Sequence, residues 1–122
     1  MILADTTIWI DHFVSADPEL ARQIANRQIL MHPMVVAELA LGSLRDRANS
    51  LAYLDRLPKV RGAQLGDVRH MIEANALYSR GIGLTDAHLI AALLLNPPAL
   101  LWTRDKRLRT VAESLGLNAK LP

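Results

Sequence analysis

The chain has 122 residues, of which 51% are hydrophobic and 21% charged, and its formal net charge is +2. This length is that of one compact domain and this composition excludes a disordered chain, so a single domain over residues 1–122 is expected to carry both fold and function. The absence of cysteine excludes disulfides, thiolate metal sites and cysteine nucleophiles, and it suits a reducing compartment.

The amino terminus and the most apolar segment both argue against a membrane protein. The opening MILADTTIWID reaches an aspartate at its fifth residue, and so lacks the basic segment and the long apolar stretch of a secretory signal. The apolar run over residues 89–102 is interrupted by Asn-Pro-Pro and is shorter than the roughly 20 residues that span a bilayer. We therefore expect a cytoplasmic protein without membrane association.

The first third of the chain alternates short apolar runs with helical patterns. Residues 2–4 suit a buried strand followed by a helix, and Asp17-Pro18 is typical of a helix start, with aspartate as N-cap and proline in the first turn. Residues 29–31 are a second predicted strand. Pro33 then opens a helix that Gly42 can end.

The middle of the chain is mostly helical in pattern. Leucines continue a helical period over residues 44–57, and residues 59–61 are expected to form a brief third strand. A further amphipathic helix begins at Leu65 and is expected to end near Gly81 and Gly83, because glycine can adopt the left-handed conformation that stops a helix. The helix that Asp86 begins is apolar on nearly every face up to Leu95, which predicts burial.

The last elements complete an α/β pattern. Residues 100–102 are a predicted strand, and apolar residues at helical spacing over 108–115 predict a final amphipathic helix. Trp9 and Trp102 lie in apolar segments and are expected in the core. Short strands that alternate with helices, without hairpin signals, predict a parallel sheet covered by helices.

Four acidic residues lie where such a sheet gathers its functional groups. Asp5 ends the first strand, Glu38 lies in the helix that leaves the second, Asp86 starts a helix, and Asp105 follows the strand at 100–102. Carboxylates held together without basic partners repel one another, so a cation is expected among them. Oxygen ligands favour Mg²⁺ or Mn²⁺, and a pair of such ions can drive phosphodiester hydrolysis.

The segments around these acids are distinctive when taken together. They are Ala-Asp5-Thr-Thr-Ile-Trp-Ile-Asp, Val-Val-Ala-Glu38-Leu, Leu-Thr-Asp86-Ala-His-Leu-Ile-Ala-Ala and Trp-Thr103-Arg-Asp105-Lys-Arg-Leu. In order, spacing and chain length they resemble the motifs of PIN-domain nucleases, and among these the VapC-type toxins. The resemblance implies a three-layer α/β/α PIN-like domain with a central short-stranded parallel sheet. It also implies an RNA substrate, Mg²⁺ or Mn²⁺, and an antitoxin partner that blocks the site.

The resemblance also assigns roles to the matched residues. Asp5, Glu38, Asp86 and Asp105 would be metal ligands, one of which could instead orient the attacking water, and Thr6 and Thr103 would support them by hydrogen bonding. Taken singly, several of these residues also suit a simpler role as helix caps. Thr6 or Thr7 could cap the first helix, and Thr103 and Asp105 the last. At Asp86 the two roles can coexist.

Basic and apolar residues outside the site are expected to bind partners. Four of the 12 acidic residues are the site acids, so the rest of the chain has 14 basic residues and only eight acidic ones. A basic surface attracts nucleic acid. The residues expected to bind RNA are Arg104, Lys106 and Arg107. The region from residue 41 to residue 54 has more leucines than one helical face of a small domain can bury. It is therefore expected to dock the antitoxin or a second subunit of a homodimer through Leu41, Leu44, Leu51 and Leu54.

Two alternatives from other functional classes remain open at this point. A phosphoacceptor receiver domain has nearly this length, and Asp55, Thr85 and Lys106 fall near its functional positions, but residues 45–54 follow a helical pattern where that fold needs a strand. A PIN fold that only binds a partner is the other alternative, against which the presence of all four acids argues. The four histidines show no H-x-x-x-H spacing, so a histidine zinc site is not expected.

Overall fold

The computed structural model describes the whole chain, residues 1–122, as an alternation of short strands and helices. The strands are β1 (Ile2–Ala4), β2 (Ile29–Leu30) and β3 (Leu100–Trp102). The helices are α1 (Thr6–Val14), α2 (Pro18–Ala25), α3 (Pro33–Ala40), α4 (Arg47–Arg56), α5 (Leu65–Ala74), α6 (Leu84–Leu95) and α7 (Lys106–Ser114).

The strands form one parallel sheet in the order β2-β1-β3, as the alternating pattern predicts. Ile2 lies opposite both Ile29 and Leu100, and Ala4 lies opposite Trp102. The backbone N–H of Asp5 donates to the carbonyl of Trp102 over 3.0 Å, so the pairing of β1 with β3 extends to the first residue of the site. The central position of β1 places Asp5 between the ends of its two neighbours.

The expected third strand over residues 59–61 is wrong. Lys59 makes only an isolated parallel bridge with Met31. The physical reasons are that Pro58 has no N–H to donate to a sheet and that the Lys59 side chain turns back to the end of α4. Its ammonium donates to the carbonyls of Leu54, Asp55 and Leu57 over 3.3, 2.7 and 3.0 Å, which satisfies carbonyls that the helix end leaves free.

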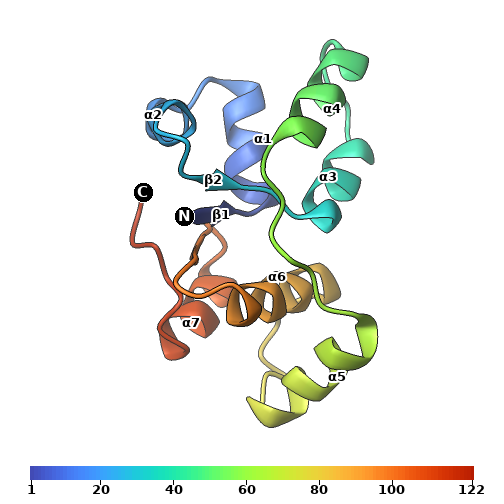
Figure 1. Cartoon of the computed structure of the whole chain (residues 1–122), viewed down its shortest axis with the longest axis vertical. Helices are drawn as coiled ribbons and strands as arrows, with labels where there is room; N and C mark the ends of the chain where they lie inside the picture. Colours follow the sequence, from blue (N-terminus) through green and yellow to red (C-terminus); the bar gives the residue numbers. More distant parts are fainter.

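Helices cover the sheet on two sides, which gives the expected three layers. Figure 1 shows α1 to α4 on one side of the strands and α5 to α7 on the other. A single cluster of 26 buried hydrophobic residues fills the space between them. Trp9 and Trp102 are fully buried in this cluster, as their apolar surroundings in the sequence predict.

Two helix ends differ from those that the sequence predicts, and in each case a local capping interaction is the reason. Helix α5 ends at Ala74 and not near Gly81, because the Asn75 side chain donates to the carbonyl of Met71 over 3.0 Å and Ala76 adopts a left-handed φ of 51°. Helix α1 is capped by Asp5 and neither by Thr6 nor by Thr7, since the Asp5 carboxylate accepts from the N–H of Ile8.

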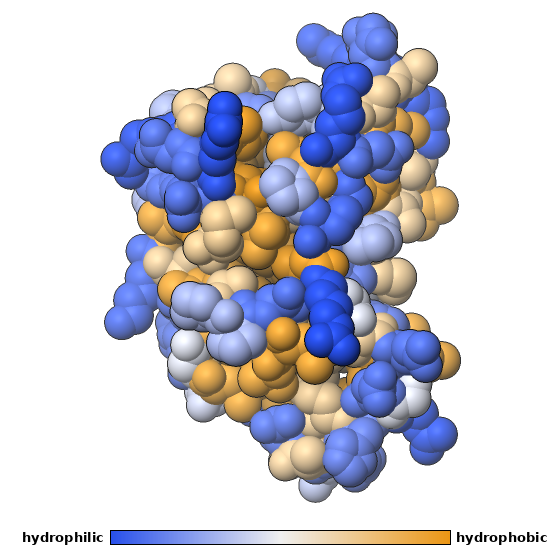
Figure 2. Space-filling model, viewed as in Figure 1, coloured by the Kyte–Doolittle hydropathy of each residue, from blue (hydrophilic) through white to orange (hydrophobic).

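Helix α6 is buried as predicted, except at its end. Its core-facing residues are buried up to Leu93, whereas Leu94 and Leu95 are 42% and 45% exposed. Figure 2 shows apolar side chains gathered over α6 and across the middle of this face, between polar side chains above and below. None of the helices combines the length and the apolar character that crossing a membrane requires.

Candidate active site

The structure brings the four predicted acids to one cleft at the carboxyl ends of β1 and β3. Asp5 follows β1, Asp105 lies at the end of the loop between β3 and α7, Glu38 lies on α3, and Asp86 is in the first turn of α6. The rest of the lining consists of Thr6, Thr7, Ile10, Gly83, Leu84 and Thr85. No basic residue lines this acid cleft.

Asp5 is the fixed member of the acid cleft. It is only 3% exposed, and its carboxylate accepts hydrogen bonds from the Thr7 hydroxyl over 2.5 Å, from the Thr103 hydroxyl, and from the N–H of Ile8 over 3.3 Å. Burial raises the pKa of Asp5, and the hydrogen bonds from Thr103 and Thr7 oppose this rise. The carboxylate therefore has a defined orientation before any ligand binds.

Two threonines connect Asp5 to the loop after β3. The Thr103 hydroxyl donates to Asp5 and accepts from the N–H of Asp105 over 3.0 Å, so one buried side chain joins two of the acids. Thr7 donates to Asp5 and accepts from the N–H of Arg104 over 3.0 Å. From the sequence, Thr7 is expected only as a possible helix cap, and the signal that could have identified its role in the site is its place two residues after Asp5.

The other three acids are held by their own helices or by a neighbour. Thr6 donates to Glu38 over 3.0 Å, the N–H of Gly83 donates to Asp86 over 3.2 Å, and the N–H of Leu108 donates to Asp105 over 3.0 Å. Asp86 and Asp105 thus occupy helix-capping positions, which was the simpler reading of each. Because both also line the acid cleft, capping and site functions coincide.

The electrostatic coupling among the acids is visible at Asp86. Burial is the main cause that raises the pKa of this carboxyl, and the N–H of Gly83 opposes it. The negative charges of Asp5, Asp105 and Glu38 raise the pKa of Asp86 further. Because the neighbouring negative charges disfavour the ionised form of Asp86, a cation bound in this cleft would be stabilised.

The donor set suits a hard divalent cation, because it consists of carboxylate and hydroxyl oxygens alone. As the side chains lie, no group of three histidine, aspartate or glutamate residues is placed to hold one metal ion together. Asp5 is fixed by its three donors, whereas Glu38 and Asp105 are exposed. Joint ligation therefore requires rotation of the exposed carboxylates toward Asp5.

A sequence profile of the PIN domain matches residues 2–114, nearly the whole chain. The chain belongs to the PIN-domain family. It is also similar to ribonuclease VapC32 of Mycobacterium tuberculosis, from the strains CDC 1551 / Oshkosh and ATCC 25618 / H37Rv. Each of these relatives is 37% identical over 117 residues, which cover 96% of this chain and 94% of the relative. The VapC-type resemblance is thereby confirmed, and the receiver-domain alternative is wrong.

Arg104 of this PIN domain does not have the free side chain that an RNA contact needs. Its guanidinium makes ion pairs with Asp11 at 2.6 Å and with Asp17 at 2.5 Å, donates to the carbonyl of Pro122 over 2.9 Å, and lies 5.9 Å from the ring centre of Trp102. The hydrogen bond from Arg104 lowers the pKa of Asp17. We therefore revise its expected role: Arg104 ties α1 and α2 to the loop that carries Thr103 and Asp105.

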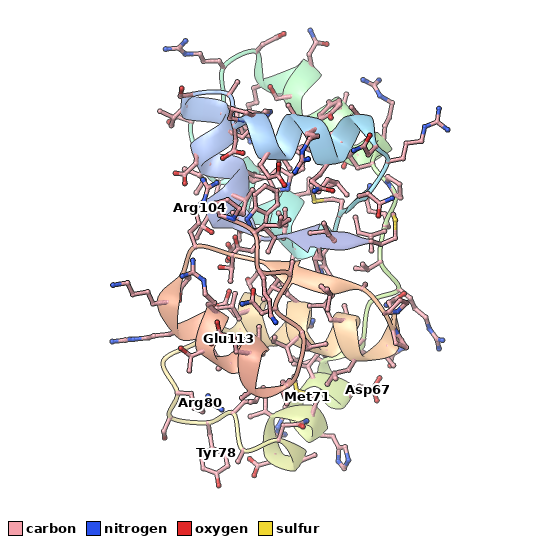
Figure 3. All side chains as sticks on the ribbon, turned by 90° about the vertical axis from the view of Figure 1, so that its left-hand side faces the viewer. Asp67, Met71, Tyr78, Arg80, Arg104 and Glu113 are labelled. Atoms are coloured by element: carbon pink, nitrogen blue, oxygen red, sulfur yellow. The ribbon has the colours of Figure 1, made fainter.

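Lys106 and Arg107 remain exposed on the first turn of α7, and a third cation joins them. Together with Arg80 and Thr110 they line a second, separate cleft, which we call the basic cleft. Arg80 was not predicted, because it stands alone in the sequence, far from the cluster around Arg104. Figure 3 shows Arg80 on the loop below α7, whereas Arg104 lies higher, beside α1.

The four leucines expected to bind a partner have different environments in the PIN fold. Leu54 is fully buried in the core, so its proposed role as a contact residue is wrong: it lies on the inward face of α4. Leu51 packs against the core, and Leu41 is 88% exposed. Leu44 precedes α4 and lines a groove with Ile10, Phe13, Val14 and Leu39, which we call the apolar groove.

Proposed function

We propose that this PIN-domain protein is an endoribonuclease that hydrolyses RNA phosphodiester bonds with Mg²⁺ or Mn²⁺ held by Asp5, Glu38, Asp86 and Asp105. The observation that carries the proposal is that these carboxylates line one cleft without a basic residue. The similarity to a protein named as a ribonuclease supports RNA as the substrate. A PIN fold that only binds a partner is the alternative, but partner binding alone does not require four carboxylates in one cleft.

The residues of the chain have distinct tasks in this mechanism. A bound divalent cation supplies a Lewis acid for the scissile phosphate and lowers the pKa of a bound water. Asp5 is the fixed anchor, since Thr7 and Thr103 hold its two carboxylate oxygens. Glu38 is exposed and can rotate from Thr6 toward the ion or toward the attacking water. Asp86 and Asp105 complete the oxygen ligands from the starts of α6 and α7.

The test is cleavage of a labelled single-stranded RNA by the purified chain. We expect cleavage with Mg²⁺ or Mn²⁺ and none with EDTA or with Ca²⁺ alone, because Ca²⁺ prefers longer bonds and more ligands than a compact four-acid site offers. Asp67→Asn is the matched control, since Asp67 is an exposed acid on α5 outside the acid cleft. Activity that survives EDTA would overturn the metal mechanism.

We further propose that the protein is the toxin of a toxin–antitoxin pair and that the antitoxin occupies the apolar groove. Ile10 and Val14 of α1 are 50% and 84% exposed there. Glu38 lines both the apolar groove and the acid cleft. An apolar segment in the groove would therefore end at the catalytic carboxylates, where a basic side chain could block them.

The double variant Val14→Arg/Leu44→Arg is expected to bind the antitoxin more weakly, because two buried charges would replace apolar contacts. A loss of at least about 10-fold in affinity is typical of a central interface residue. The measurement is titration of the antitoxin by calorimetry, with Leu65→Arg as the control at an exposed leucine on α5, outside the apolar groove. Equal affinities for the two variants would rule out this groove.

The proposal includes a homodimer that acts in the cytoplasm. The partly exposed Leu94 and Leu95 at the end of α6 supply apolar surface for a second subunit. Light scattering of the purified chain measures its mass, and a monomer at micromolar concentration would contradict the homodimer.

A further inference from the structure

The basic cleft combines three cations without a counter-ion. Its lining consists of Arg80, Lys106, Arg107 and Thr110, with neither an acidic nor an apolar residue. The ion pairs of the chain involve only Arg22 and Arg104 among its basic residues. Arg80 is half-buried, and Lys106 and Arg107 are exposed, so their charges converge on a hollow that is open to solvent. An anion would fit there.

The basic cleft and the acid cleft are built from the same two segments. The connection from Arg80 to Asp86 contributes Arg80 to one and Gly83–Asp86 to the other. The start of α7 contributes Lys106 and Arg107 to one and Asp105 to the other. An RNA strand with one phosphate bound in the acid cleft would therefore place another of its phosphates beside the three cations of the basic cleft.

The arrangement of Arg107 depends on a particular glycine. Gly81 has a φ of +77°, a conformation that L side chains rarely adopt. A Cβ at this position would lie 2.6 Å from the Cδ atom and 2.9 Å from an Nη atom of Arg107. The Arg107 side chain thus packs directly on the backbone beside Arg80, in space that a larger residue would occupy. The loop holds the two guanidinium groups near one another.

We propose that Arg80, Lys106 and Arg107 form a subsite for a backbone phosphate of the RNA strand next to the phosphate that is cleaved. The inference rests on the proposed ribonuclease function and adds to it how the strand is held. Guanidinium groups bind phosphate through two parallel hydrogen bonds, and phosphate contacts position a strand without reading its bases. The subsite therefore fixes the register of the strand and leaves sequence preference to other residues.

The experiment measures RNA affinity separately from cleavage. Binding of a short labelled single-stranded RNA is followed by fluorescence anisotropy in EDTA over a range of salt concentrations. For single strands each phosphate contact contributes about 0.7 to the slope of log K against log salt. We expect Arg107→Gln and Arg80→Gln each to lower the slope by about 0.7, and the double variant to raise Kd roughly 10-fold at low salt.

Several variants serve as controls. Arg69→Gln, at an exposed arginine on α5, should keep the wild-type slope. Gly81→Ala should weaken RNA binding in the same direction as Arg107→Gln, because its Cβ displaces the Arg107 side chain. Melting temperatures confirm that each variant is folded, and Lys106→Gln replaces any variant that is not.

The outcomes distinguish the subsite from the ribonuclease proposal. If the wild type binds and cleaves RNA while the arginine variants keep its salt slope, the subsite is overturned and the ribonuclease stands. If the wild type neither binds nor cleaves RNA, both proposals fail. A lowered slope in the Arg80 and Arg107 variants, with an unchanged slope in Arg69→Gln, supports the subsite.

Discussion

Asp5→Asn is expected to abolish RNA cleavage and to remove the stabilisation that Mn²⁺ gives to the wild type. Asp5 is the most deeply buried of the four acids and the one whose orientation is fixed by three donors. Loss of a residue that merely supports a metal ligand costs about 10- to 100-fold in activity, so loss of the anchoring ligand should cost at least about 100-fold.

The metal-free form of Asp5→Asn should melt at the wild-type temperature or above it. The substitution removes one negative charge from a cleft in which burial raises the pKa of Asp5 and its charge raises the pKa of Asp86. Asparagine caps a helix about as well as aspartate, so the hydrogen bond to Ile8 is retained. Its amide also offers one acceptor and one donor to the two threonine hydroxyls, which can rotate to match.

The response to Mn²⁺ separates a metal site from a set of helix caps. An ion at about 100 times its Kd stabilises the folded state by about 2.7 kcal/mol, which should raise the wild-type melting temperature by roughly 10 °C. Asp5→Asn should lose most of this rise, whereas Asp67→Asn should keep it. Equal rises in wild type and Asp5→Asn would show that Asp5 is not a ligand, and the central proposal would then be wrong.

The positions of the acids could be predicted because each depends on local sequence. Asp5 directly follows an apolar strand, Asp105 lies in the short loop after another, and the strands of a parallel sheet end at one edge. What holds these acids could not be predicted in the same way. Arg104 pairs with Asp17 across 87 positions of sequence and meets the Thr7 hydroxyl across 97 positions. Such pairs follow from the packing of α1 and α2 on the sheet, which no local pattern specifies.

The errors along the chain have a common cause in competing local interactions. Residues 59–61 are apolar and basic like a short edge strand, but Lys59 binds the carbonyls at the end of α4. The leucines at 41 to 54 share a helical spacing, yet the break between α3 and α4 turns Leu54 inward and leaves Leu41 in solvent. Spacing predicts which residues share a face, and only the helix boundaries decide where that face points.

Thr103→Val is expected to impair both stability and cleavage while leaving the shape of the core unchanged. Thr103 is buried, and its hydroxyl joins Asp5 to the N–H of Asp105. Valine has nearly the same volume but no hydroxyl, so a buried carboxylate oxygen loses a donor and the N–H of Asp105 loses its acceptor. Leaving buried polar groups unpaired costs about 1 to 3 kcal/mol, which thermal unfolding measures.

The effect of Thr103→Val on cleavage should exceed what the loss of stability explains. Without the Thr103 hydroxyl only one oxygen of the Asp5 carboxylate keeps its donors, the Thr7 hydroxyl and the N–H of Ile8, so the carboxylate can rotate. We therefore expect cleavage to fall about 10- to 100-fold at a temperature where the variant is fully folded. Thr103→Ser keeps the hydroxyl and should restore most of the activity. In an Asp5→Asn background Thr103→Val should change the Mn²⁺ response no further, because the carboxylate that it orients is already absent. If Thr103→Val cleaved RNA at the wild-type rate and kept the full rise in melting temperature with Mn²⁺, the orientation of Asp5 would not depend on this hydroxyl.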